Sequence, residues 1–515
     1  MNKRLVLSFV LVTIVEYSSA ANILILGMPF YSHLFGPANV GQFLQTQGHN
    51  LLVASPPQLK EKLEKHGVQL LLYHCLGDFP EDDLLRESFL NDFFNTTSFI
   101  QQPIVRHSKG IDPTQTVKQI ARKIVKDVNL LKNIQDFGPD LIVLDSGPSA
   151  VMLTLIPYKL NIPFVMIGSE EFPQATRAPI LPTVFPYKNY FYIDHMSFLE
   201  RIINTLKHLN TYWNYPYSNL SLIYDYVPEK PYISPTDLQA KAQLWIVRQP
   251  SVFSYNSPTL PNMRRVAHLQ TLVPKPLPPE FQTFIESADD GVIIVSFGTI
   301  MRTLPLQIQL KLLAAFEQTK YKVIMQSAQP PNNHSDKFMF RKWLPQFDLL
   351  SHPKAKLFIT HCGSNGIQES LTASVPIIGF PIFADQPHNA NKVVRKGFGL
   401  MLDLRSFSVH ELFSAIKEVT TNPLYQANVE RASAILKSER VPPIEEAAFW
   451  INHVLTFGGD HLRSYAQDIP LWKYLGLDII ALVIVFWHVF VYLLAMILKC
   501  CLPHWCGRKH KLKHD

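Results

Sequence analysis

The sequence predicts an α/β protein with two parallel-sheet domains and one C-terminal membrane helix. Short apolar, β-branched segments alternate with helical patterns along most of the chain, which is typical of parallel strands covered by helices on both faces. A proline-dense stretch from Pro258 to Pro279 divides this pattern into two halves. Residues 479–498 then form an uncharged apolar run. A chain of 515 residues has room for two large domains.

Residues 1–20 are predicted to form a secretory signal peptide. Lys3 and Arg4 precede an apolar run that is short for a membrane span, and Ser18-Ser19-Ala20 supplies small residues for cleavage. We therefore expect the mature chain to begin after Ala20.

The first domain is expected to cover 21–270, with a parallel sheet at its centre. Its clearest strands are expected at 22–26, 50–54, 69–73, 141–144 and 163–167. The first strand is followed by Gly27-Met28-Pro29-Phe30, without the G-x-G-x-x-G turn that a dinucleotide needs at this place. A dinucleotide oxidoreductase is therefore disfavoured.

The linker is expected at 271–285, because dense proline disfavours a regular helix or a central strand. The second domain is expected at 286–440. Its strands are predicted at 292–296, 322–325, 355–359, 376–380 and 400–402.

Residues 478–498 are predicted to span a membrane as one helix. At about 1.5 Å per residue such a helix covers a hydrocarbon core of about 30 Å. The tail at 499–515 is basic, which places it in the cytosol and the body of the chain in the lumen, as a single-pass type I protein. Lys511 and Lys513 resemble a dilysine retrieval signal, which favours the endoplasmic reticulum membrane. His488, inside the span, is expected to be neutral and bonded within or between helices.

The formal charge of +7 is concentrated at the chain ends. The tail carries +4 and the leader +1, so the body keeps only +2, and nothing indicates a nucleic-acid partner. Cys75 and Cys362 are expected to be free thiols. Cys500, Cys501 and Cys506 follow the span, where they could be palmitoylated or stay unmodified. In the predicted topology, the sequons at Asn95, Asn219 and Asn333 are exposed to the glycosylation machinery.

The stretch from Trp343 to Gln386 combines several groups that suit a nucleotide sugar. An indole stacks on a flat base. A glycine-rich turn before a helix offers backbone N–H groups and a positive dipole end to phosphate. The carboxylate of Glu369, one turn into that helix, suits a ribose diol, and Asp385-Gln386 suits the hydroxyls of a sugar.

This stretch resembles the signature of the UDP-glycosyltransferases, the family that includes the animal UDP-glucuronosyltransferases. The resemblance extends over nearly the whole chain and implies the GT-B fold, with two Rossmann-like domains facing a cleft. It also implies that residues 441–477 hold a helix that crosses back onto the first domain, followed by a juxtamembrane segment. The implied activity is the inverting transfer of a sugar from a UDP-sugar to a small lipophilic acceptor. Family members often self-associate, so a homo-oligomer is a possible state.

His33 is expected to act as general base and Asp145 to orient it. Both residues follow predicted strands, and ligands of open α/β sheets bind beyond the carboxyl ends of the strands. A neutral imidazole can take the proton of an acceptor hydroxyl while a carboxylate holds its other nitrogen. The family resemblance implies the same two roles.

The remaining predicted site residues bind the UDP-sugar. Trp343 is expected to stack on uracil, Gln346 to bond the base or ribose, and Glu369 to bond the ribose. The diphosphate is assigned to His361, Gly363, Asn365 and Gly366, with Gly298 and Thr299 closing over it; Asp385 and Gln386 are assigned to the sugar. The chain has no D-x-D motif, so no metal and no cofactor beyond the UDP-sugar co-substrate are expected.

Two departures from the family pattern affect the choice of donor. Gln326, counted with the donor residues, stands where glucuronosyltransferases often have arginine, and His388 stands where vertebrate enzymes usually have an acid. UDP-glucuronate and a neutral donor such as UDP-glucose therefore both remain open. The aromatic stretch at 185–232 could line an acceptor pocket, touch the membrane lipid or only pack helices. Two alternatives also remain: a hexosyltransferase acting on a membrane sphingoid, and a non-catalytic UDP-sugar-binding protein.

Overall fold

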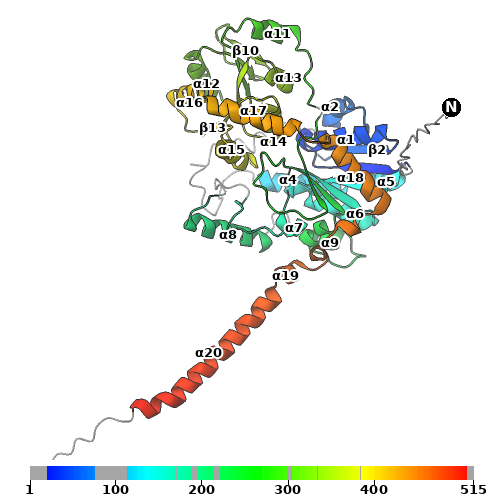
Figure 1. Cartoon of the computed structure of the whole chain (residues 1–515). Coiled ribbons are helices and arrows are strands. Elements are labelled where there is room, and N and C mark those ends of the chain that lie inside the picture. Colours follow the sequence, from blue (N-terminus) through cyan, green and yellow to red (C-terminus); the bar gives the residue numbers. More distant parts are fainter. Residues whose placement is uncertain are drawn as a thin grey trace, which may run out of the picture.

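The computed structural model contains two α/β domains and one long C-terminal helix (Figure 1). It describes residues 20–75, 113–169, 171–187, 195–213, 221–270, 272–298, 301, 304–332, 334–382 and 384–506. Residues 1–19 of the signal peptide, the asparagines of the three sequons, Thr299 and the end of the basic tail lie outside these residues.

The first domain is built on a seven-stranded parallel sheet in the order β3-β2-β1-β4-β5-β6-β7. Its strands are β1 (Asn22–Leu26), β2 (Asn50–Ser55), β3 (Gln69–Leu72), β4 (Leu141–Asp145), β5 (Phe164–Gly168), β6 (Leu244–Arg248) and β7 (Met263–Val266). The inner strands β4, β5 and β6 are buried along their whole length, because helices cover both faces of the sheet.

Helices surround this sheet on both sides. They are α1 (Tyr31–Thr46), η1 (Pro57–Leu59), α2 (Lys60–Glu64), α4 (Pro113–Lys126), α5 (Val128–Phe137), η2 (Pro148–Thr154), α6 (Leu155–Leu160), α7 (Pro173–Thr176), α8 (Phe198–Trp213), α9 (Ser221–Tyr226) and α10 (Pro235–Ala240). Two apolar clusters, one on each face of the sheet, form the core of the domain.

The second domain is built on a six-stranded parallel sheet in the order β10-β9-β8-β11-β12-β13. Its strands are β8 (Val292–Ser296), β9 (Lys322–Gln326), β10 (Phe338–Arg341), β11 (Ala355–Thr360), β12 (Ile377–Gly379) and β13 (Gly399–Met401). Its helices are α11 (Pro279–Glu286), α12 (Leu306–Glu317), α13 (Gln346–Leu350), α14 (Ser364–Thr372), α15 (Gln386–Arg395), α16 (Val409–Thr421) and α17 (Pro423–Lys437).

All ten strands predicted from the sequence are present, within one or two residues at each end. β6, β7 and β10 were not predicted. β7 lies inside the proline-dense stretch, and it is tolerated there because it is an edge strand of the sheet. α11 begins within the range 271–285 that we assigned to the linker, with Pro279 at its first helical position.

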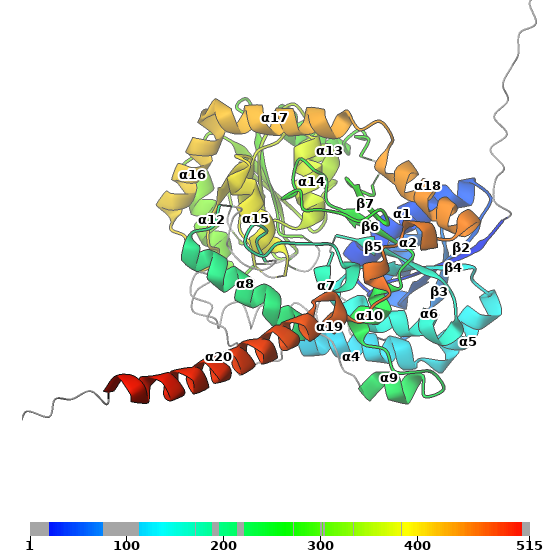
Figure 2. The same cartoon turned by 60° about the horizontal axis from the view of Figure 1, so that its bottom comes forward.

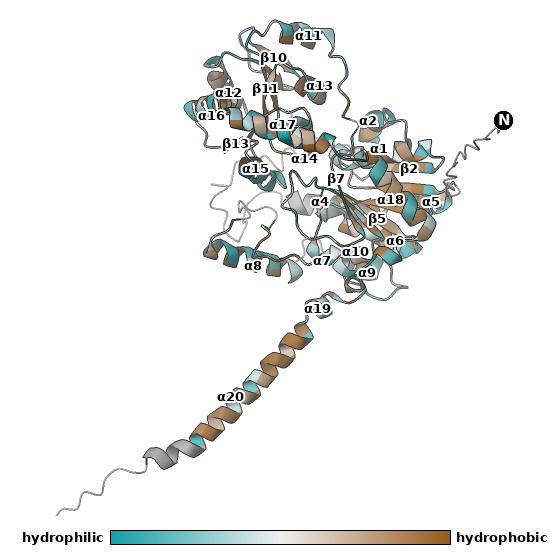
Figure 3. Cartoon of the chain, in the orientation of Figure 1, coloured by the Kyte–Doolittle hydropathy of each residue, from teal (hydrophilic) through white to brown (hydrophobic). Residues whose placement is uncertain are grey.

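The C-terminal part of the chain returns to the first domain before it leaves the body of the protein. α18 (Pro443–Phe457) packs against α1, β6 and β7. It is followed by η3 (Asp460–Leu462), η4 (Tyr465–Gln467), α19 (Leu471–Tyr474) and α20 (Leu477–Cys506). Residues Leu477–Cys500 of α20 are long and apolar enough to cross a membrane, and Figure 3 shows the apolar character along the helix.

Candidate active site

His33 and Asp145 meet at the point where the strand order of the first sheet reverses. His33 lies in the first turn of α1, directly after β1, and Asp145 is the last residue of β4. β1 and β4 are neighbours, although the connections from β1 to β2 and from β4 to β5 run in opposite directions across the sheet. Such a switch point separates the loops above it and is where open α/β sheets bind ligands.

The two side chains form a short hydrogen bond. His33 Nδ1 donates to Asp145 Oδ2 at 2.6 Å, with the imidazole about one-third exposed and the carboxylate buried. Oδ1 of Asp145 accepts the N–H of Gly147 at 3.0 Å. Burial disfavours the ionised form of Asp145, but the charge and hydrogen bond of His33 and the N–H groups of Gly147 and Met28 hold its pKa below its ordinary value. An ionised Asp145 fixes the ring and leaves proton exchange to Nε2.

The second sheet has its own switch point, between β8 and β11. Gly298 follows β8, and His361 follows β11. Gly298 has a φ of +82°, and a Cβ on it would lie 2.6 Å from Cε1 of His361. A Cβ on Gly363 would lie 2.6 Å from Nε2 of the same ring. The two glycines therefore let two loops close on His361 from both sides.

His361 is a neutral imidazole in this environment. Burial lowers its pKa to about 4, although a hydrogen bond to the backbone of Ser296 acts in the opposite direction. A neutral ring next to the N-terminus of α14 offers hydrogen bonds to an anion without a competing buried charge.

α14 brings the predicted phosphate and ribose groups together. Gly363 is the residue before its first turn, and Gly366 lies in that turn. Gln346 Nε2 donates to Glu369 Oε2, so the base-side and ribose-side residues are in direct contact. Burial raises the pKa of Glu369 to about 7, although the bond from Gln346 opposes this shift. Because this buried carboxyl group has lost most of its hydrogen bonds to water, it is suited to accept hydrogen bonds from hydroxyl groups.

Trp343 lies before α13, and its indole is 53% exposed, which leaves a face open for stacking. Gln326 is placed differently from the other predicted donor residues. Its side chain is buried and engaged on both sides, because Oε1 accepts from Ser296 Oγ at 2.8 Å and Nε2 donates to the carbonyl of Lys342 at 3.3 Å. Gln326 therefore ties the end of β9 to its neighbouring strands below the site.

Asp385 and Gln386 stand at the start of α15. Asp385 is partly exposed, and its Oδ2 accepts from Asn389 Nδ2 at 2.7 Å. Gln386 is buried, and its Oε1 accepts the N–H of Ile382 at 2.9 Å. The carboxylate of Asp385 is therefore partly open to solvent, while the buried amide of Gln386 fixes the conformation of the preceding loop.

Arg248 is a site residue that the sequence reasoning missed. It is the last residue of β6, it is buried, and its Nη1 donates to Asn365 Oδ1 of the second domain at 2.6 Å. Burial lowers its pKa, while the charges of Asp145 and Asp385 raise it. The arginine therefore lies between the two halves of the site, and it engages the Asn365 amide that we had assigned to phosphate. The signal was the apolar run Leu244–Arg248, which ends in a charged residue as β4 does at Asp145.

Sequence and structure comparisons place the chain beside glycosyltransferases. The profile of the family described as "UDP-glucoronosyl and UDP-glucosyl transferase" matches residues 21–511. UDP-glucuronosyltransferase 2C1 of Oryctolagus cuniculus is 28% identical over 502 residues, which cover 94% of this chain and 99% of that protein. UDP-glucuronosyltransferase 2A2 of Homo sapiens is 32% identical over 399 residues, with 75% and 72% covered.

Two solved structures have the same fold at low sequence identity. The glycotransferase of kitacinnamycin superposes with a TM-score of 0.59 at 17% identity, covering 84% of this chain and 99% of that one. The calicheamicin glycosyltransferase CalG4 gives 0.58 at 17% identity, with 85% and 98% covered.

Proposed function

Because the chain belongs to the UDP-glucuronosyl and UDP-glucosyl transferase family, we propose that it transfers a hexose or hexuronic acid from a UDP-sugar to a hydroxyl group of a small lipophilic acceptor, with inversion and without a metal. The family assignment makes the chain a UDP-glycosyltransferase with the GT-B fold. The acceptor class, the stereochemistry and the residue roles that follow are the proposal.

The observation that carries the mechanism is the His33–Asp145 pair. Asp145 holds Nδ1 of His33 at 2.6 Å, so Nε2 takes the proton of the acceptor hydroxyl. The acceptor oxygen then attacks the anomeric carbon from the face opposite UDP, and the bond from that carbon to the diphosphate oxygen breaks. The sugar inverts, UDP leaves with the electron pair, and the proton remains on His33.

The second domain holds the donor in this proposal. Trp343 stacks on uracil, Glu369 and Gln346 bond the ribose, and Asp385 bonds the transferred sugar. The diphosphate lies at the start of α14, against His361 and the N–H groups that follow Gly363. These groups stabilise the charge that develops on UDP, which is the role that a metal held by a D-x-D motif has in other glycosyltransferases.

Two residues bear on the identity of the sugar. Gln326 is neutral and buried below the site, so it offers no cation to a carboxylated sugar. Arg248 provides a guanidinium at the domain junction, and the charge of Asp385, the residue assigned to the sugar, raises the pKa of this guanidinium. UDP-glucose and UDP-glucuronate are both tested for this reason.

We also propose that the protein is a single-pass type I protein of the endoplasmic reticulum membrane with its catalytic body in the lumen. Residues Leu477–Cys500 supply the span, and basic residues follow it. The sequons and the leader agree with this topology.

A donor screen tests the proposal. Microsomes that contain the full chain are given five donors (UDP-glucose, UDP-glucuronate, UDP-N-acetylglucosamine, UDP-galactose and UDP-xylose) with a panel of phenols and steroids, with and without EDTA. We expect one donor to dominate, a β-linked product from the α-linked donor by NMR, and no effect of EDTA. An α-linked product contradicts the inverting mechanism, and loss of transfer in EDTA contradicts metal independence.

A further inference from the structure

Two loops of the second domain that are assigned to the donor each contain one strained residue. Cys362, directly after His361, has a φ of +64°. Ala384, directly before Asp385, has a φ of +54°. Neither residue is a glycine, so each carries the steric cost of a left-handed conformation. Such a backbone persists only where other contacts hold it, so the contacts of these two loops bear on donor binding.

One buried side chain, Asn389 of α15, links the two loops. Its amide nitrogen donates to the carbonyl of Cys362 at 3.1 Å and to Oδ2 of Asp385 at 2.7 Å. The side chain is only 5% exposed. An amide group has two N–H donors, and these two bonds use both of them. Figures 1 and 2 both show α14 and α15 next to each other in the second domain, so a residue of α15 can reach the loop before α14.

The bond to Cys362 fixes a peptide group that the proposed function gives to the diphosphate. In a trans peptide, the carbonyl of one residue and the N–H of the next point in opposite directions. The direction of the Cys362 carbonyl therefore sets the direction of the N–H of Gly363, the residue before the first turn of α14. A Cβ on Gly379 would overlap Sγ of Cys362, so the thiol is packed against the end of β12. Asn389 and β12 together leave this peptide little freedom to turn.

The bond to Asp385 orients the carboxylate that the proposed function gives to the transferred sugar. Asp385 is the residue before α15, and Asn389 lies one turn into that helix, so its amide reaches back to Oδ2. The backbone N–H of Asn389 also donates to the carbonyl of Asp385, at 2.9 Å. A bond from an amide to a carboxylate is charge-assisted and is stronger than a bond between neutral groups. The carboxylate is therefore held in one orientation before a sugar binds.

We propose that Asn389 is a positioning residue for the donor, and that it couples the loop assigned to the diphosphate to the loop assigned to the sugar. The inference deepens the proposed function and rests on it. Asn389 acts through the N–H of Gly363 and the carboxylate of Asp385, without touching the donor itself. Because one amide serves both loops, its loss disturbs the diphosphate and sugar subsites together, whereas the uracil subsite at Trp343 keeps its contacts.

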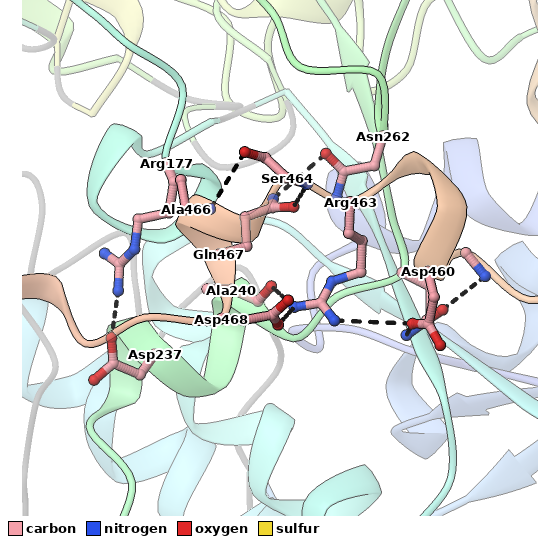
Figure 4. Close-up of polar contacts among 12 residues, drawn as sticks. Arg177, Asp237, Ala240, Asn262, Asp460, Arg463, Ser464, Ala466, Gln467 and Asp468 are labelled. Carbon is pink, nitrogen blue, oxygen red and sulfur yellow. Dashed lines mark hydrogen bonds and ion pairs between the residues drawn. The ribbon is translucent and has the colours of Figure 1, made fainter. Parts of the chain in front are cut away.

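Asn389→Ala removes both bonds, and Gln467→Ala is the matched control. Gln467 is 3% exposed, and its amide nitrogen donates to the carbonyl of Thr176 at 3.0 Å and to Oδ1 of Asn262 at 3.4 Å. Figure 4 shows this amide among the polar contacts of η4 with the first domain. Both substitutions delete a buried amide that is bonded to one carbonyl and one side-chain oxygen, but only Asn389 is bonded to the donor loops. If Asn389→Ala does not fold, Asn389→Ser, whose hydroxyl keeps at most one of the two bonds, takes its place.

The first readout compares UDP with uridine, which lacks the diphosphate. The affinity of the purified full chain for each ligand is measured by calorimetry, and the melting temperature verifies the fold of each variant. We expect Asn389→Ala to bind UDP about 10-fold more weakly than the wild type and to bind uridine equally well. Gln467→Ala should bind both ligands as the wild type does. Equal losses for UDP and uridine in Asn389→Ala would reveal a general disturbance of the second domain and overturn the inference, and so would unchanged UDP affinity.

The second readout is a double-mutant cycle with Asp385→Ala. With Asp385 present, Asn389→Ala should lower kcat/KM by more than it lowers UDP affinity, because the carboxylate is no longer oriented. In the Asp385→Ala background, it should lower kcat/KM only as much as UDP affinity. Equal effects on kcat/KM in the two backgrounds would show that Asn389 does not act through Asp385, which overturns the coupling. A wild-type chain that binds UDP but transfers no sugar refutes the proposed function alone, and the comparison of UDP with uridine then decides the inference.

Discussion

Gly298→Ala is predicted to move His361 and to weaken donor use. Gly298 has a φ of +82°, and a new Cβ would lie 2.6 Å from Cε1 and 2.7 Å from Nε2 of His361. Unstrained contacts between carbon atoms lie at about 3.5–4.0 Å, so the ring must shift by about 1 Å. A non-glycine residue in a left-handed conformation costs about 1–2 kcal/mol in addition.

Gly48→Ala is the matched control for the backbone cost. Gly48 has a φ of +96°, and an added Cβ would meet no atom within 4 Å. Gly48→Ala should therefore lose about 1–2 kcal/mol in the free energy of unfolding, and Gly298→Ala should lose at least this backbone cost. A shift of about 1 Å in a positioning group costs up to 10²-fold in rate, so only Gly298→Ala should lose kcat/KM on that scale.

The assay compares the two variants in three measurements: denaturant unfolding, UDP affinity by calorimetry, and kcat/KM with the donor that the screen selects. The reasoning predicts that Gly298→Ala loses at least as much stability as Gly48→Ala, and that only Gly298→Ala loses UDP affinity and transfer. If Gly298→Ala binds UDP and transfers sugar as well as Gly48→Ala does, the loop after β8 does not position His361 for the donor.

Three further predictions follow from the site. Glu369→Gln should raise the melting temperature at pH 8, change it little at pH 5, and lower UDP affinity. The native pKa of Glu369, about 7, lies above its ordinary value, so the wild-type chain loses stability as pH rises from about 5 to 7, and the glutamine variant does not. A variant with the wild-type pH dependence of melting contradicts that assignment. Asp145→Asn should lower kcat/KM by about 10²–10⁴ and keep UDP affinity, because it removes the anionic partner of His33. As the pH falls below about 4, this variant should also lose less stability than the wild type. The native pKa of Asp145 is depressed, so the stability that its carboxylate contributes to the wild type disappears as the pH falls. Stability curves that superpose in acid would count against an ionised, hydrogen-bonded Asp145. Arg248→Gln should weaken UDP binding and transfer, because it removes a charge-assisted hydrogen bond to Asn365 that is worth about 1.5–3 kcal/mol. Arg248→Lys should not restore either property. Full activity of the lysine variant would show that only the charge matters.

The sequence predicted the strand ends well, because buried parallel strands are continuous apolar runs and ligand groups follow them. His33 and Asp145 are 112 residues apart in the chain and still lie in one hydrogen bond. β6 was overlooked, and Arg248 at its end with it. Arg248 acts through a contact with Asn365 that is made only when the two domains pack together, and no local pattern encodes such a contact.

Side-chain direction was the other feature that the sequence did not reveal. Gln326 and Gln386 are assigned to the donor from the sequence, and the structure adds that both amides are buried and bonded to protein groups. The donor assignment itself stays a prediction. α8 illustrates the same difficulty on the surface. Only the bonds of Asn204 and His208 show that its apolar residues point outward.

The central claim is that His33 removes the acceptor proton, and the rate of the His33→Ala variant tests it most directly. His410→Ala, an exposed histidine on α16, is the control for the substitution itself. The account predicts that kcat/KM falls by about 10²–10⁴ for His33→Ala, with UDP affinity unchanged and His410→Ala like the wild type. Transfer by His33→Ala at the rate of His410→Ala would contradict the account.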